Sequence, residues 1–263
     1  MRSKRMLLLV CLAAAPALAQ PIRKDAANPS VPALSQRAQV TVRWLGHAAF
    51  EITSSGGTRV LVDPFISGNP ATPDSLKNLA RYAGAWRPHA ILVSHAHGDH
   101  AGDAKAIAQS SGAPVISAGE WIETLGLPQA QAMGGNVGGT FRIGDVTIRL
   151  VPAMHSSEPG RALGFIIEVP GGRTVYHTGD TWIFADMALI QERYRPSIIL
   201  MGVGGGPYTE DPADAAFALR KWFTPRTVVP MHFGTFPGLA TEAQVRAALP
   251  TATIMRPGET RTF

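Results

Sequence analysis

The chain has 263 residues, of which 45% are hydrophobic and 16% are charged, and its formal net charge is +5. This length and apolar content suit one sizeable folded domain or two closely packed halves. A single cysteine, Cys11, excludes a disulfide within the chain.

The first residues have the pattern of a secretory signal peptide. Three basic residues within 2–5 precede an apolar run over residues 6–15, and small residues lead up to Ala19. We expect residues 1–19 to be removed by cleavage between Ala19 and Gln20, which predicts a periplasmic or secreted protein. The run is too short to span a bilayer comfortably, although an uncleaved anchor is the competing interpretation.

Cleavage would change the charge and the cysteine count. It removes three positive charges and no acidic ones, so the net charge falls from +5 to about +2. Because no cluster of lysine and arginine remains, we expect no nucleic-acid partner. Cys11 is removed as well, which leaves no disulfide and no thiolate metal ligand. Removal of the apolar segment leaves no stable membrane anchor.

The remainder divides into a leader and one domain. Residues 20–38 hold three prolines and little periodicity, so we expect a flexible leader, with a single domain over 39–263. Thr72 and Pro73 predict a helix start, with the helix running through Ala80. Apolar residues at helical spacing from Ala101 predict another helix that stops at Gly112. Predicted strands in this half cover 40–45, 48–53, 59–62, 90–93, 114–117, 139–143, 145–152, 163–169 and 173–178.

The second half alternates helices with strands. Asp211 predicts a helix start, with Pro212 in the first helical position. Further helices are predicted near 186–194 and over 241–249, and further strands over 197–201, over 226–231 and near the C-terminus. Two strand-rich halves, each covered by helices, predict an α/β fold with the four layers of an αββα sandwich.

The most informative segment is Ser-His-Ala-His-Gly-Asp-His at residues 94–100. It places His95, His97, Asp99 and His100 directly after an apolar strand. Imidazoles and a carboxylate suit a divalent cation such as zinc, with manganese or iron as alternatives. His95 and His97 are able to hold one ion, and Asp99 and His100 a second. A polar surface loop is the alternative interpretation.

Three more candidate ligands follow strand-like segments further along the chain. His155 comes after residues 146–151, Asp180 after 174–179 and His232 after 227–231. Each candidate stands at the C-terminal end of a predicted strand, where loops from several strands meet.

The segment 94–100 resembles the HxHxDH signature of the metallo-β-lactamase superfamily, and the three later residues match its downstream positions. The resemblance implies the αββα sandwich, with metals at one edge between the sheets. It implies that His95, His97 and His155 bind one metal, that Asp99, His100 and His232 bind a second, and that Asp180 bridges them. Such a pair of ions shares a water and lowers its pKa to near neutrality, which provides a hydroxide nucleophile. Asp99 would orient the hydroxide and pass its proton to the leaving group.

Other segments resemble one branch of this superfamily, the metal-dependent hydrolases (UPF0173-like) related to the phosphorylated-ascorbate lactonase. They are residues 46–48 (Gly-His-Ala), 134–140, 176–181 and 231–237. The resemblance implies that Asp63 holds a ligand histidine by its outer nitrogen, with an Asp-Pro turn as the alternative.

Further residues are expected around the site. We expect His47 to line the pocket or bond substrate and not to complete the set of metal ligands, and a buried histidine held by backbone is the alternative. Trp182 and Tyr208 depart from the branch pattern, and we expect them in the pocket, so the substrate does not carry over from the branch. His177 and His89 are expected to be structural.

Two glycine-rich segments complete the expected site. We expect residues 134–140 and 203–207 to let backbone approach it closely, with simple tight turns as the alternative for 203–207.

The sequence therefore predicts an exported dinuclear hydrolase that uses a metal-bridging hydroxide on an ester, a lactone or a phosphodiester. A metallo-β-lactamase acting on β-lactam amides is the alternative, but true members resemble this chain in their histidines and use cysteine or serine near the position of Asp180. A metal-binding protein without turnover is the third hypothesis. We expect two divalent ions, zinc before manganese, iron or nickel, and a small-molecule substrate. A homo-oligomer is left open.

Overall fold

The computed structural model describes residues 39–171 and 173–263, and these belong to one compact unit. The predicted signal peptide 1–19 and leader 20–38 lie outside the described residues. In the part of the chain that is described, none of the helices has the length and apolar character needed to cross a membrane.

One sheet has seven strands in the order β13-β1-β2-β3-β4-β5-β6. Strands β13, β1, β2 and β3 are antiparallel, and β3 to β6 are parallel. Parallel neighbours end at the same edge of a sheet, so the loops after β3 and β4 begin side by side. The strands are β1 (Val40–Gly46), β2 (Ala49–Ser54), β3 (Arg59–Val62), β4 (Ala90–Leu92), β5 (Val115–Ala118), β6 (Ala132–Gly135) and β13 (Thr260–Thr262).

The other sheet has six strands in the order β12-β11-β10-β9-β8-β7. Strands β12, β11 and β10 are parallel, and the remaining pairs are antiparallel. The loops after β10 and β12 therefore leave the same edge. The strands are β7 (Thr140–Ile143), β8 (Val146–Pro152), β9 (Leu163–Val169), β10 (Arg173–His177), β11 (Ile198–Gly202) and β12 (Thr227–Met231).

Alternate residues of the first sheet face two different cores. In β3, Val60 and Val62 join a core that contains Phe165 of the other sheet, whereas Leu61 joins a second core with Ile107 of helix α2 (Ala104–Ser111). Successive side chains of a strand point to opposite faces, so a sheet covered on both sides is apolar on both.

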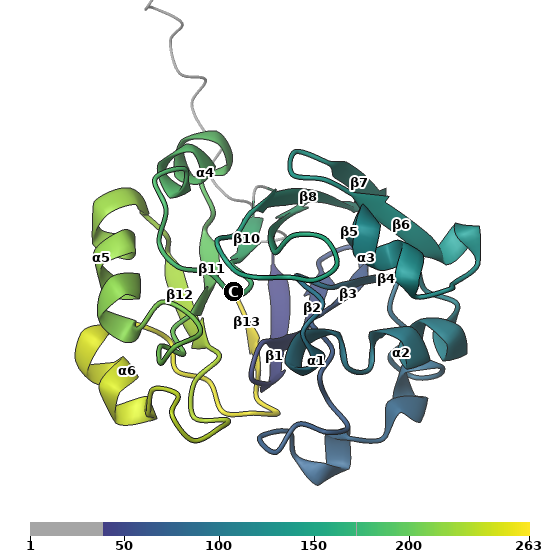
Figure 1. The fold of residues 1–263 in the computed structure, drawn as a ribbon, viewed down its shortest axis with the longest axis horizontal. Coiled ribbons are helices and arrows are strands. Elements are labelled where there is room, and N and C mark those ends of the chain that lie inside the picture. The colour runs from purple at the N-terminus through teal and green to yellow at the C-terminus, as the bar shows by residue number, and fades with distance from the viewer. Residues whose placement is uncertain (1–38, 172) are drawn as a thin grey trace, which may run out of the picture. The chain divides into compact units, whose positions relative to one another are not determined.

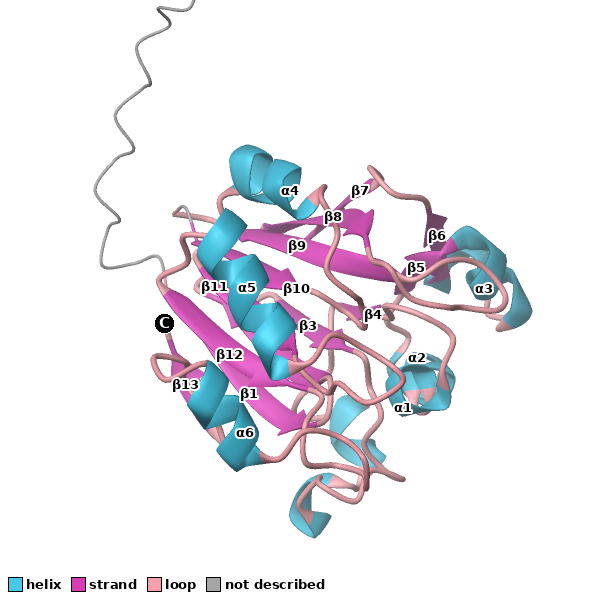
Figure 2. Ribbon diagram, turned by 60° about the vertical axis from the view of Figure 1, so that its left-hand side comes forward, coloured by secondary structure: helices cyan, strands magenta, loops and turns pink. Residues whose placement is uncertain are grey.

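Helices cover the outer faces of the two sheets. Helices α1 (Gly98–Ala101), α2 and α3 (Gly119–Thr124) lie on the side of the first sheet. Helices α4 (Met187–Tyr194), α5 (Pro212–Trp222) and α6 (Glu242–Ala248) lie along the second (Figures 1 and 2). The arrangement confirms the predicted four-layer αββα sandwich.

The helix predicted from Thr72 through Ala80 is wrong. Two short 3₁₀ helices, Asp74–Leu76 and Leu79–Tyr82, occupy this region. The Thr72 hydroxyl donates to the carbonyl oxygen of Leu45 at 2.6 Å and caps nothing. A contact to a distant strand therefore replaces the expected helix cap.

The helix expected from Ala101 to Gly112 is divided in two. Asp103 separates α1 from α2, and its carboxylate accepts hydrogen bonds from the backbone N–H groups of Ile66 and Ser67 at 2.7 and 2.8 Å. Gly112 ends α2 in a left-handed conformation, as glycine favours at helix ends. Asp103 thus ties the metal-ligand segment to the loop after β3.

Candidate metal centre

The candidate ligands meet at one edge of the sandwich because they stand on loops that follow strands of both sheets. His95 follows β4, His155 follows β8, Asp180 follows β10 and His232 follows β12. His97 is the residue before α1, and Asp99 and His100 lie in its first turn. The structure brings together all seven residues that the sequence singled out as metal ligands.

The first group consists of three imidazoles, His95, His97 and His155. The Nδ1 atom of His97 is 2.9 Å from Nε2 of His95 and 3.3 Å from Nε2 of His155. One nitrogen from each ring lies within 4.8 Å of the others. Burial, together with the nearby His100, lowers the pKa of His95 to about 2. The neutral imidazole is the form that binds a metal.

The second group combines His100 and His232 with carboxylates. The Oδ2 atom of Asp180 is 3.0 Å from Nε2 of His232 and 3.3 Å from Nε2 of His100. The same oxygen is 3.8 Å from Nε2 of His155, which belongs to the first group. Asp99 Oδ2 lies 3.9 Å from Nε2 of His232. Asp180 therefore reaches both groups.

The polar atoms of the second group fit a cation. Among the described residues, Nε2 of His100, Nε2 of His232 and Oδ1 of Asp180 are buried without a hydrogen-bond partner. Buried polar atoms are normally paired because an unpaired one costs free energy. Burial favours a neutral His100, but Asp180 and Asp63 outweigh it and raise its pKa well above the usual value. The same negative charge favours a divalent cation at this nitrogen.

Asp63 supports the second group from behind. Its Oδ2 accepts a hydrogen bond from Nδ1 of His100 at 2.8 Å, and both carboxylate oxygens accept from Ser94 at 2.7 Å. Burial alone would raise the pKa of Asp63, but the neighbouring His100 holds it below the usual value. The contact fixes which nitrogen of His100 points to the site, and it places Asp63 as the resemblance implied.

Left-handed backbone positions three of these loops. Asp63, His47 and His232 have φ angles of 44°, 53° and 63°. A residue with a Cβ atom adopts this conformation at a cost of roughly 1–2 kcal/mol. Such strained residues gather where the surrounding structure holds a functional geometry.

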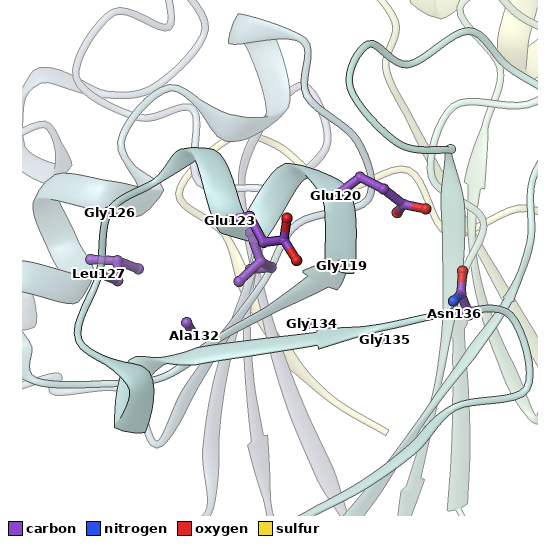
Figure 3. A pocket seen from close by; sticks show the side chains of 10 residues that line it. Gly119, Glu120, Glu123, Gly126, Leu127, Ala132, Gly134, Gly135 and Asn136 are labelled. Atoms are coloured by element: carbon purple, nitrogen blue, oxygen red, sulfur yellow. The ribbon is translucent and has the colours of Figure 1, made fainter.

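The segment 203–207 approaches the site as expected. A Cβ atom on Gly204 would lie 2.4 Å from Nδ1 of His232, so only glycine fits. The expectation for 134–140 is wrong: this segment forms β6 and the turn to β7. Gly134 packs against Gly119, and the segment lines a separate cavity of about 520 Å³ together with α3 (Figure 3).

A cavity of about 320 Å³ opens over the ligands. Tyr208 lines it, as expected, although its side chain is 64% exposed. Trp182 does not line it; its Nε1 donates to Asp214 at 3.1 Å. Phe236 and Pro237 belong to the segment 231–237 that carries the family resemblance, and Leu239 is a wall residue that no motif in the sequence indicated. The lining residues are His97, Asp99, His155, Asp180, Tyr208, His232, Phe236, Pro237 and Leu239.

The other histidines have distinct surroundings. His177 is buried, donates from Nε2 to the Ala48 carbonyl at 3.0 Å and accepts the Gly179 N–H at 3.1 Å. His89 accepts the N–H of Arg59. Both therefore have structural contacts. His47 is fully buried and does not line the cavity, so the expectation that it lines the pocket is wrong.

Known proteins are similar to this chain in fold and, in part, in sequence. A family model described as a beta-lactamase superfamily domain matches residues 41–232. The solved structure of Igni18, a metallo hydrolase from the archaeon Ignicoccus hospitalis, has a TM-score of 0.74 and 36% identity, covering 86% of this chain and 98% of its own. The metallo-β-lactamase fold protein YhfI from Bacillus subtilis has a TM-score of 0.66 at 15% identity, covering 86% of this chain and 100% of its own, which shows likeness of fold alone.

Relatives with higher sequence identity show to which branch of the superfamily the chain belongs. A UPF0173 metal-dependent hydrolase of Myxococcus xanthus is 43% identical over 220 residues, which cover 78% of this chain and 75% of that protein. Another, from Pyrobaculum islandicum, is 43% identical over 200 residues, covering 74% and 85%. The chain therefore belongs to the metallo-β-lactamase superfamily, in its branch of UPF0173 metal-dependent hydrolases.

Proposed function

We propose that this hydrolase is exported, holds two divalent ions and cleaves an ester, a lactone or a phosphodiester of a small molecule. The observation that carries the dinuclear site is the position of Asp180, whose Oδ2 lies within 3.8 Å of imidazole nitrogens from both ligand groups. One carboxylate between two groups of ligands suits a bridging role. Two ions, when bound, supply a hydroxide at neutral pH and stabilise negative charge on the attacked group.

Residues of the chain have separate tasks in this proposal. The imidazoles and Asp180 hold the ions, and Asp63 fixes the orientation of His100. Asp99 lines the cavity with a side chain that is 34% exposed, so it is placed to orient an attacking water and pass a proton to the leaving group. Tyr208 and Phe236 shape the space for the substrate.

Metal analysis joined to a substrate panel tests the function. Purified protein loaded with Zn²⁺ or Mn²⁺ would be assayed on lactones, carboxylic esters, phosphodiesters and a chromogenic β-lactam. We expect two ions per chain and turnover in one of the first three classes. Fast turnover of the β-lactam alone would show the alternative, an amide hydrolase.

The role of Asp99 has its own test. In Asp99→Asn, the amide can still bind an ion but cannot take up a proton. We expect turnover to fall by about 10²- to 10⁴-fold, the usual contribution of a general acid or base. Two retained ions with full turnover would rule out the role.

The proposed location rests on the N-terminal sequence pattern alone. Fractionation of cells that express the full chain, with mass measurement of the N-terminus, tests it. We expect the protein in the periplasm or medium, beginning at Gln20. A cytoplasmic protein that retains Met1 would contradict export.

A further inference from the structure

His47 lies beside His100 and His232 of the second ligand group, and no role has been assigned to it so far. It stands between β1 and β2 with a left-handed φ of 53°. Its carbonyl oxygen accepts the N–H of His232 at 3.1 Å and the indole N–H of Trp44 at 2.9 Å. The rings of His47 and His232 are 3.8 Å apart between centroids. The backbone of His47 is thus tied to the loop that carries a ligand.

The ring of His47 faces the same point as the ligands of the second group. Its Nε2 is 3.1 Å from Oδ2 of Asp99. One ligand atom from each of His47, Asp99, His100 and His232 lies within 4.8 Å of the others. Metal–nitrogen bonds are about 2.0–2.1 Å long, so donors on opposite sides of one ion lie roughly 4 Å apart. The four donors, within 4.8 Å of one another, are therefore close to the spacing that one bound ion requires.

A comparison with His177 separates this ring from a structural histidine. Both rings are fully buried, but both nitrogens of His177 are hydrogen-bonded to backbone groups. In the described part of the chain, Nδ1 of His47 has no hydrogen-bond partner, and the partner of Nε2 is the expected ligand Asp99. Among the described residues, the hydrogen bond of the His47 ring is therefore made to an expected metal ligand, whereas the ring of His177 bonds only backbone groups.

We propose that His47 is an additional ligand of the ion held by Asp99, His100 and His232. This inference rests on the proposed dinuclear site. With Asp180, the second site then has five protein ligands, whereas the first has three histidines and Asp180. Zinc sites are usually four-coordinate, and higher coordination with carboxylates and imidazoles suits manganese or iron(II). The two sites would differ in their preferred metal.

The competing role for His47 is a hydrogen bond to Asp99 without metal coordination. Loss of affinity cannot separate the two, because removing an outer partner also weakens metal binding by about 10- to 100-fold. The number of imidazoles bound to the ions does separate them. His47→Asn is the suitable variant, since asparagine tolerates left-handed backbone and its amide can still bond Asp99. His89→Asn is the control, because His89 contacts the backbone of Arg59.

The experiment uses the full chain, stripped of metal and loaded with Co²⁺. A bound imidazole that keeps its ring N–H gives one exchangeable, strongly shifted proton signal, and metal analysis counts the ions. We expect two ions and six signals for the wild type, five for His47→Asn and six for His89→Asn. Two ions with five signals in both the wild type and His47→Asn would overturn the role of His47 and leave the dinuclear site intact. One ion per chain would contradict the dinuclear site and this inference together.

Discussion

The two ligand groups of the metal centre differ in charge and burial. The first contains only imidazoles, and its His97 and His155 are more exposed than His95. In the second, His100 and His232 are buried and contact the carboxylates of Asp63, Asp99 and Asp180. A buried dication needs compensating negative charge. The second group provides most of it, and the first depends on Asp180 for its carboxylate.

Removal of a ligand from the first group should have the largest effect on metal content and turnover. His95 belongs to the first group, and its ring also lies beside His100 and Asp180. For His95→Ala we expect loss of one ion and a fall in turnover greater than the roughly 100-fold that loss of an outer partner costs. Metal analysis and kinetics measure both effects, and circular dichroism should show a retained fold. His89→Ala is the control; a fully active His95→Ala with two ions would contradict the assignment.

Loss of the buried charge behind His100 should affect one ion more than the other. In Asp63→Asn, the amide has the same shape without the charge, and its NH₂ group opposes the N–H donors of His100 and Ser94. We expect one of the two ions to bind about 10- to 100-fold more weakly, as chelator competition would show. Ser94→Ala, which keeps the carboxylate, should have a smaller effect. Equal weakening of both ions would remove the distinction between the groups.

The buried carboxyl of Glu210 sharpens the contrast because neither of its oxygens has a hydrogen-bond partner among the described residues. Burial raises the pKa of Glu210 well above the usual value, and the nearby Asp214 and Asp180 raise it further. Above about pH 4.5 the carboxyl group of Glu210 therefore ionises in the unfolded chain but stays protonated in the folded chain. The free energy of unfolding falls as pH rises from there to the folded-state pKa.

Glu210→Gln should remove this pH-dependent loss. Relative to the wild type, we expect its free energy of unfolding to increase with pH by up to about 1.4 kcal/mol per pH unit above pH 4.5. Urea unfolding of metal-free protein at several pH values measures it. Glu192→Gln, at an exposed position of α4, is the matched control for the loss of a glutamate. A flat difference for Glu210→Gln would contradict an ionisation penalty.

Strands were easier to predict than helix boundaries. Alternation of apolar residues is a local property, so strands such as β1, β3 and β8 follow from the sequence alone. Thr72 and Asp103 misled the helix assignments because their side chains bond distant backbone, at Leu45 and at Ile66 and Ser67. Likewise, β6 lies in a glycine-rich segment that pairs with β5 through Gly134 and Gly135.

The metal ligands were predictable for a similar reason. His95, His97, Asp99 and His100 stand within one short segment, and their residue types alone indicate divalent-metal chemistry. The position of His47 was not predictable, because its ring reaches Asp99 across 52 residues of chain. Leu239 was missed as a cavity wall because nothing in its local sequence relates it to the ligands.

The sequence by itself determined the type of chemistry, since imidazoles and carboxylates after apolar strands have few other uses, and it determined the layered fold through its periodicity. Only the tertiary structure decided which donors share a point in space, which histidine is structural and which cavity faces the ions. The physical reason is that left-handed backbone at His47, Asp63 and His232, and the close approach of Gly204, aim side chains from loops of both sheets. The directions of these side chains depend on contacts between segments far apart along the chain.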